Sequence, residues 1–125
     1  MIHATPYIRF AGQAREALTF YRDVFGGTLE IVDMEGSPEQ VMHGHLVAEA
    51  GWHLMAADNP ESALAESQRV TICIWGDDLE TMTDQFNRLA EDGTVHMPLE
   101  AREWGDTFGG IKDKYGVDWG FNIGS

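Results

Sequence analysis

The sequence contains little cysteine and no long apolar run, and each shortage excludes a class of protein. Its one cysteine, Cys73, cannot form a disulfide within the chain, which favours a reducing compartment. Because Cys73 lies in an apolar run over 70–75, we expect a buried and unreactive thiol. No segment approaches the roughly 20 apolar residues that a membrane-spanning helix needs, and the first residues do not resemble a signal peptide. We therefore expect a cytoplasmic protein.

Positive charge is also scarce. Only 8 Lys and Arg stand against 21 Asp and Glu, which gives a formal net charge of −13 at pH 7. A chain of this charge repels polyanions, so nucleic acid and anionic membrane surfaces are poor partners. Solubility is the simplest reason for the charge, and a cationic or neutral small ligand is compatible with it. The 125 residues, 43% of them hydrophobic, suffice for one domain with its own core.

A strand, a helix and three strands are predicted in the first half. An alternating run at 7–10 precedes a helical pattern that Gly26 and Gly27 end. The apolar side chains of the helical pattern share one face: Ala14, Ala17, Leu18, Tyr21 and Phe25. Three further strands are expected at 28–32, 41–49 and 52–57.

The second half repeats this order. A strand at 70–75 precedes a capping box at 77–80, which opens a helix that Gly93 ends. The expected buried face of this helix consists of Leu79, Met82, Phe86 and Leu89. Strands are expected at 94–99, 108–112 and 117–123. Sliding the halves by 66 residues places Gly27 on Gly93, and a slide of 65 places Gly51 on Gly116, which indicates a duplication.

The predicted organisation is one domain over 1–125, with a first module at 1–58, a linker at 59–67 and a second module at 68–125. The fold class is α+β: two tandem βαβββ modules form a curved, partly open barrel of mixed β-sheet with the helices outside. The barrel closes within the chain or across a dimer, and its interior would line a ligand cavity.

Several segments resemble a known family. Residues 17–27 resemble the first-helix signature of the glyoxalase/bleomycin-resistance/dioxygenase (vicinal oxygen chelate) superfamily. The segments that resemble PhnB-like members are 6–10, 41–46, 54–58, 104–110 and 113–119. The resemblance implies a homodimer. It does not imply one activity, because the superfamily includes isomerases, lyases, dioxygenases, thiol transferases and drug binders.

The resemblance also implies where a metal would bind. In superfamily enzymes the first and last strands of each module usually supply one ligand each to a divalent metal. Those positions fall on Thr5, Met55 and Gly120, with Gln68 as the nearest polar residue in the remaining strand. Because these residues are poor or absent donors, we expect no metal cofactor. One alternative stays open: His3, His53 and Asp118 each lie two residues earlier on the same side of a strand, and they are either a displaced metal site or solvent-facing residues.

Two histidines are the candidate catalytic residues. His43 and His45 point to the same side of one strand, where His45 could act as a general base with His43 as its partner. Alternating histidines are also common on the polar face of a strand. Asp58 and Asp113 are expected to bond turn backbone rather than to act in catalysis.

The expected ligand-binding residues are Tyr7, Arg9, Trp104, Phe108 and Trp119. Trp104 and Phe108 lie in a segment rich in glycine and aromatic residues, which is typical of a ligand clamp, a dimer contact or packing at the barrel edge. An inward Arg9 would need a carboxylate or an anionic ligand, whereas an outward Arg9 would need none. Trp119 and Trp75 lie in predicted strands, where a place in the core is favoured over a ligand-binding role for both.

Two functions are compatible with these residues, and whether the protein is an enzyme stays open. The favoured function is a dimeric small-molecule-binding protein that lacks the usual metal ligands. The alternative is a glyoxalase/dioxygenase-like lyase or isomerase that uses a displaced metal site or His45 as base.

Overall fold

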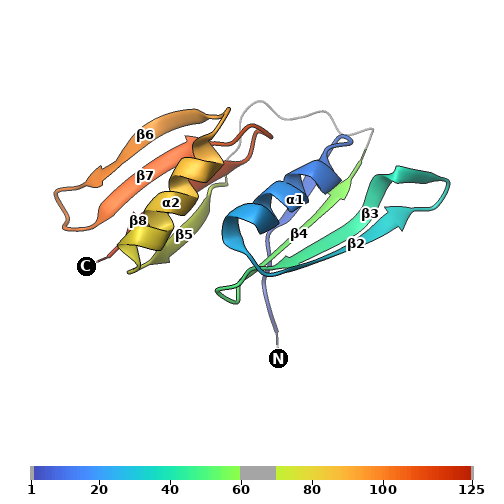
Figure 1. Ribbon diagram of the computed structural model, residues 1–125, viewed down its shortest axis with the longest axis horizontal. Coiled ribbons are helices and arrows are strands. Elements are labelled where there is room, and N and C mark those ends of the chain that lie inside the picture. Colours follow the sequence, from blue (N-terminus) through green and yellow to red (C-terminus); the bar gives the residue numbers. More distant parts are fainter. Residues whose placement is uncertain (1, 60–69, 125) are drawn as a thin grey trace. The chain divides into compact units, whose positions relative to one another are not determined.

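The computed structural model describes residues 2–59 and 70–124, and each of these two ranges belongs to its own compact unit (Figure 1). Each unit is a four-stranded mixed sheet with one helix over one of its faces. Apart from Asn59, the predicted linker at 59–67 lies outside the described residues, as does Gln68. No helix in the described ranges is long and apolar enough to cross a membrane.

The first unit follows the predicted order of elements. Its elements are β1 (Tyr7–Phe10), α1 (Ala14–Phe25), β2 (Thr28–Met34), β3 (Ser37–Val47) and β4 (His53–Asp58). The strand order is β1-β4-β3-β2. β1 runs parallel to β4, whereas the β2–β3 and β3–β4 pairs are antiparallel. β1 thus lies beside the last strand of its unit.

The second unit repeats the same topology. Its elements are β5 (Ile72–Gly76), α2 (Leu79–Ala90), β6 (Thr94–Ala101), β7 (Thr107–Lys112) and β8 (Asp118–Ile123). The order is β5-β8-β7-β6, again with the parallel pair between the first and last strands. The prediction of an α+β fold built from two tandem βαβββ modules is confirmed.

The two helices pack as their sequences predict, with one exception. All five side chains expected on the buried face of α1 are buried. In α2, Met82, Phe86 and Leu89 are buried, but Leu79 at the first helical position is 56% exposed. Asp78 is the N-cap of α2 and accepts a hydrogen bond from the Thr81 N–H at 3.1 Å. This bond holds the pKa of the Asp78 carboxyl below its ordinary value.

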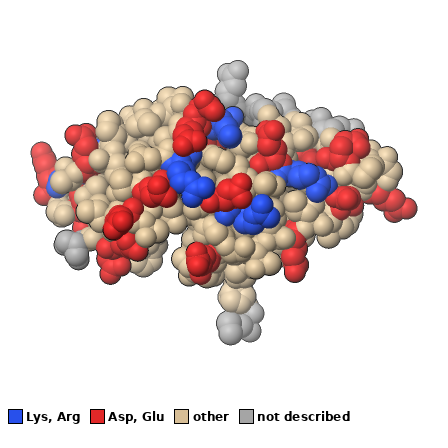
Figure 2. Space-filling model, in the orientation of Figure 1, with Lys and Arg blue, Asp and Glu red and all other residues tan. Residues whose placement is uncertain are grey.

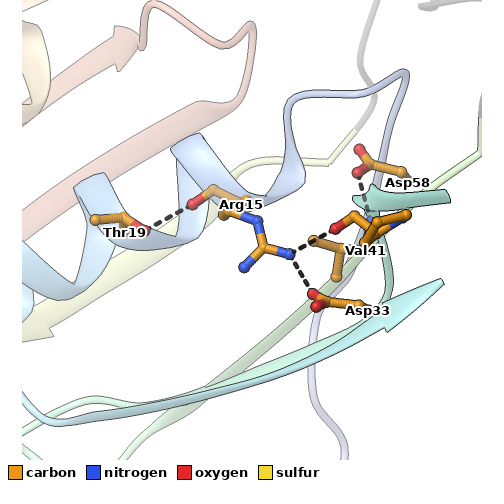
Figure 3. A network of polar contacts seen from close by, with 6 residues as sticks. Arg15, Thr19, Asp33, Val41 and Asp58 are labelled. Carbon is orange, nitrogen blue, oxygen red and sulfur yellow. Dashed lines mark hydrogen bonds and ion pairs between the residues drawn. The ribbon is translucent and has the colours of Figure 1, made fainter.

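Each unit contains one buried carboxylate that bonds backbone N–H groups. Asp58 accepts bonds of 2.9 Å from the N–H groups of Gly12, Ala14 and Val41, and so joins the start of α1 to β3. On the same side of the sheet, Arg15 of α1 pairs with Asp33 of β2 (Figure 3). Asp113 closes the β7–β8 turn by accepting from the N–H groups of residues 115 and 117. The expectation that Asp58 and Asp113 bond backbone is confirmed.

The exposure of side chains on β5 contradicts the expectation that they are buried. Cys73 is exposed, and Trp75 is 79% exposed, whereas the apolar run suggested burial. β5 is an edge strand, and Cys73 and Trp75 occupy the face of the sheet that α2 does not cover. Partial desolvation nevertheless raises the pKa of the Cys73 thiol above its ordinary value, so the thiol is less readily ionised.

Charge on the surface follows the composition. Figure 2 shows Asp and Glu spread over the visible face, with the few Lys and Arg side chains among them. The ion pairs agree with this picture, because Arg15, Arg22 and Arg88 each pair with an aspartate.

Candidate functional site

The face of the first sheet opposite α1 holds most of the predicted site residues. Strand alternation directs Leu46, Leu54 and Ala56 under the helix, where they are fully buried. The alternate positions therefore point to the other face, which we call the histidine face: Tyr7 and Arg9 of β1, His43 and His45 of β3, and His53, Met55 and Ala57 of β4. The predicted residues Tyr7, Arg9, His43 and His45 are thus brought together on one surface.

Register across the sheet fixes the neighbours on this face. Tyr7 lies beside Met55, which in turn lies opposite His45. Glu30 of β2 lies opposite His45 on its other side, and directly opposed side chains in a sheet are in contact range. Glu30 is thus the one acidic residue placed by register directly beside His45.

Tyr7 and His43 form a hydrogen-bonded pair. The Tyr7 hydroxyl lies 3.1 Å from His43 Nδ1, and the two ring centroids are 5.7 Å apart. Tyr7 is half exposed and His43 is half-buried, so both rings can be reached from solvent. Which atom donates depends on the tautomer of His43.

Arg9 lies beside this pair and has no partner among residues 2–59 and 70–124. It is paired in register with Ala57, a residue with a small side chain. Each of the other four arginines in the described ranges takes part in an ion pair with Asp or Glu. Within those ranges Arg9 forms neither an ion pair nor a hydrogen bond, although the chain carries 21 acidic residues. The exposed guanidinium is free to contact an added group.

His45 and His53 form the second hydrogen-bonded pair. His45 Nε2 lies 2.8 Å from His53 Nδ1, with ring centroids 5.0 Å apart. The sequence reasoning did not couple these two residues. A signal was present, because a hairpin turning at Ala50–Gly51 places positions 45 and 53 on the same face of neighbouring strands. His53 also stacks on His3, with ring centroids 6.5 Å apart.

The remaining predicted residues belong to the second unit. Trp104 is 63% exposed in the turn between β6 and β7, and its ring centroid is 6.2 Å from that of Phe108. Phe108 lies opposite Asn122 of β8, on the face that α2 does not cover. Asn122 is itself paired in register with the exposed Trp75. Trp75 and Phe108 thus lie on the same face of this sheet, with Asn122 between them.

Trp119 does not belong to either surface. Its side chain is fully buried, and its indole N–H donates to Asp113 Oδ2 at 2.8 Å. Alternation along β8 directs residues 119, 121 and 123 toward α2, so Trp119 is a core residue and we retain no ligand-binding role for it.

The metal positions implied by the resemblance do not fit a divalent ion. Met55 offers only a thioether, and Gly120 has no side chain. The space that a side chain at position 120 would occupy is already lined by the Phe108 ring, 3.6 Å from the Cβ position. Within residues 2–59 and 70–124, no group of three or more His, Cys, Asp or Glu is arranged to hold a metal. Of the alternative set, His3 and His53 lie in the first unit, while Asp118 lies in the second, where it pairs with Lys112 at 3.1 Å.

The fold and these surfaces define a glyoxalase-type protein, and comparison with known proteins agrees. The model of the Glyoxalase/Bleomycin resistance protein/Dioxygenase superfamily matches residues 3–121. This chain therefore belongs to that superfamily.

Three individual relatives are similar to this chain over nearly its whole length. The structure of protein PA1353 from Pseudomonas aeruginosa has 33% identity and a TM-score of 0.89, covering 99% of this chain and 98% of PA1353. The PhnB protein from Bacillus cereus has 26% identity and a TM-score of 0.82, covering 98% and 99%. YjdN of Escherichia coli K12 is 26% identical over 137 residues, covering 95% of this chain and 93% of YjdN. The chain is thus similar to PhnB-like members, as its motifs predict.

A more distant likeness concerns the fold alone. The complex of a bleomycin-binding protein with bleomycin has 19% identity and a TM-score of 0.64, and it covers 100% of both chains.

Proposed function

We propose that this chain is a small-molecule-binding protein whose ligand contacts Arg9, Tyr7 and His43 on the histidine face. The observation that carries the proposal is the guanidinium of Arg9, which pairs with no residue of the described ranges and lies beside the Tyr7–His43 hydrogen bond of 3.1 Å. Arg9 is paired in register with Ala57, whose side chain is only a methyl group. Catalysis is not required for this function.

The chemistry of these three groups favours a planar carboxylate. A guanidinium donates two parallel hydrogen bonds to a carboxylate, a geometry that no other side chain offers. A phenol and an imidazole supply further donors at the edge of the same space. The net charge of −13 opposes the approach of any anion, but physiological salt screens that field beyond about 8 Å. Contact with Arg9 is therefore expected to outweigh the distant repulsion.

One protein of the same fold supports the binding of a small molecule. A bleomycin-binding protein with the same fold was solved with bleomycin bound, so the fold is compatible with holding a small molecule. At 19% identity this similarity supports a shared fold and does not identify the ligand of this chain.

A pair of matched probes tests the proposal. Benzoate and benzamide have the same shape and differ in charge, and their binding to chelator-treated protein can be followed by amide chemical-shift changes at 0.15 M salt. We expect benzoate to shift Arg9 and Ala57, and benzamide to do so at least 10-fold more weakly. Arg9→Gln should abolish the preference for benzoate, while the ion-paired Arg88→Gln should keep it. Equal binding of both probes, or a preference that survives Arg9→Gln, would contradict the proposal.

We also propose that the protein is a cytoplasmic homodimer. The PhnB-like resemblance supports the dimer, and the single cysteine supports a reducing compartment. Light scattering after size-exclusion chromatography distinguishes the monomer mass of 13.9 kDa from twice that value. A monomer at micromolar concentration would contradict the dimer and leave the ligand proposal untouched.

The second candidate function is acid–base catalysis with His45. The hydrogen bond of 2.8 Å between His45 and His53 favours it, because a catalytic base is usually oriented by a second group. In this proposal His45 removes a proton from the substrate, and the hydrogen bond to His53 orients the imidazole ring of His45. His43 is the neighbouring polar group. Deuterium uptake by hydroxyacetone in D₂O tests it: exchange that His45→Asn removes and His96→Asn leaves would support catalysis. No exchange above the buffer rate would count against a base at this position.

A further inference from the structure

A cluster of aromatic and polar side chains lies on the face of the second sheet that α2 does not cover. Register places Asn122 of β8 between Trp75 of β5 and Phe108 of β7. The ring of Trp104 lies against that of Phe108, with centroids 6.2 Å apart and an interplanar angle of 64°. The Asn122 side-chain amide donates to Asp106 Oδ2 at 2.9 Å, which brings the Asp106 carboxylate to the same face. We call these five residues the Asp106 cluster.

The turn between β6 and β7 carries two members of the cluster, Trp104 and Asp106. The N–H of Arg102 donates to the Asp106 carbonyl at 2.8 Å, and the N–H of Gly105 donates to the Arg102 carbonyl at 3.0 Å. The Arg102 guanidinium also donates to the Phe108 carbonyl, from Nε at 3.2 Å and from Nη2 at 3.1 Å. These bonds fix the backbone of the turn, so Trp104 and Asp106 are held in place by the chain itself.

One oxygen of the Asp106 carboxylate is available to a ligand. Asp106 is half-buried, and its Oδ1 accepts no hydrogen bond from residues 2–59 and 70–124. Two other acids on this face already lie beside a cation. The Asp118 carboxylate is 3.1 Å from the Lys112 ammonium, and the Glu100 carboxylate is 3.9 Å from the Arg102 guanidinium. Asp106, by contrast, forms no ion pair within the described ranges, so its charge can serve an added cation.

The rings of the cluster favour an organic cation over a metal ion. Trp75 and Trp104 are both exposed, and the face of an indole ring attracts a cation more strongly than any other side-chain ring does. A metal ion needs several donors, and residues 2–59 and 70–124 contain no group of three or more His, Cys, Asp or Glu that could hold one. The net charge of −13 also attracts cations to this protein.

We propose that the Asp106 cluster binds a small organic cation, whose alkylammonium group contacts the Asp106 carboxylate and the rings of Trp75 and Trp104. Asp106 Oδ1 supplies the opposite charge, while the bond from Asn122 to Oδ2 orients the carboxylate. The tryptophan rings contact the methyl or methylene groups of the ligand. This inference goes beyond the proposed function and uses no residue of the histidine face, so a failure of benzoate binding leaves it standing.

Choline and 3,3-dimethylbutan-1-ol test the site, because the two molecules have the same shape and only choline is charged. The full chain is titrated with each at 0.15 M salt, and binding is followed by the indole N–H resonances of Trp75 and Trp104. We expect choline to shift both resonances, and the neutral alcohol to bind at least about 5-fold more weakly. Trp75→Ala and Trp104→Ala should each weaken choline binding about 2- to 5-fold, because each removes one ring.

Two substitutions that each remove one negative charge decide the assignment. Asp106→Asn keeps an acceptor for the Asn122 amide and should abolish the preference for choline over the alcohol. Glu103→Gln, in the same turn, should keep that preference.

Three results would overturn the proposal. The first is equal binding of choline and the alcohol, or no shift of either resonance at tens of millimolar choline. The second is a preference for choline that Asp106→Asn and Glu103→Gln reduce alike, which would assign it to the net charge of the chain. The third is a pair of resonances that shift with protein concentration and not with choline, which would assign the face to a second copy of the chain.

Discussion

The indole N–H of Trp119 donates to the carboxylate of Asp113 at 2.8 Å, and both side chains are buried. The same carboxylate accepts from the N–H groups of Tyr115 and Val117 at 2.8 and 3.0 Å. One side chain thus fixes both the β7–β8 turn and the largest core residue of its unit. A carboxylate with three donors is a structural anchor, which explains why an acid is tolerated in this core.

Asp113→Ala is expected to destabilise the protein by about 2–4 kcal/mol, because it leaves three buried N–H donors without their acceptor. Urea unfolding followed by tryptophan fluorescence measures the change. Glu103→Ala, an exposed acid in the β6–β7 turn, is the matched control and should change stability by less than about 0.5 kcal/mol. Similar values for the two variants would show that the bonds of Asp113 are replaced by water.

Two glycines with the same backbone conformation should respond differently to alanine. Gly27 has φ 103°, and a Cβ there would lie 1.9 Å from the Val47 carbonyl oxygen. Gly51 has φ 102°, but a Cβ there meets nothing within 4 Å. Gly51→Ala should therefore cost about 1 kcal/mol from the backbone alone, and Gly27→Ala should cost about 3 kcal/mol or more. Thermal unfolding of both variants gives the comparison, and equal losses would mean that the close approach relaxes freely.

The helix cap at Asp78 predicts a pH dependence. The Thr81 N–H lowers the pKa of the carboxyl in the folded state. Its stabilising effect is thus present above the ordinary aspartate pKa, and it is lost as the pH falls through the folded-state pKa. Asp78→Ala should lower the urea midpoint at pH 7, and the difference from the wild type should shrink in acid. Asp77→Ala, which removes the neighbouring acid, should have the same urea midpoint as the wild type. A difference for Asp78→Ala that persists at pH 2 would assign the effect to packing instead of the charged cap.

The exposed Cys73 should react with a disulfide reagent while the protein is folded. Desolvation raises the pKa of its thiol, so at pH 7 the reaction should be slower than in the urea-unfolded chain and should accelerate as the pH rises. Absorbance of the released thiolate follows both rates. A thiol that reacts only after unfolding would restore the sequence-based expectation of burial.

Local patterns in the sequence predicted most of the elements and their order. The helix at 14–25 has an apolar face with a period of 3.6 residues, and a glycine ends it at the φ of 71° that favours glycine. The duplication was visible because glycines recur where backbones approach closely: a Cβ at Gly93 would lie 2.5 Å from the Lys112 carbonyl oxygen, as one at Gly27 would from that of Val47. The helical period and the glycine that ends the helix depend on neighbours along the chain, and the duplication is a match between two stretches of sequence, so the sequence displays them directly.

Which face of each strand is covered depended on the tertiary structure. Trp75 lies in the apolar run at 70–75 and Trp119 in the predicted strand at 117–123, yet Trp75 is 79% exposed and Trp119 is fully buried, because only Trp119 points toward α2. Likewise, His45 was recognisable as a candidate from its spacing to His43, but its partner is His53 on the next strand. Alternation and the turn residues determine the two faces of a strand, whereas the pairing between strands and the position of the helix decide which face is core and which residues meet on the other.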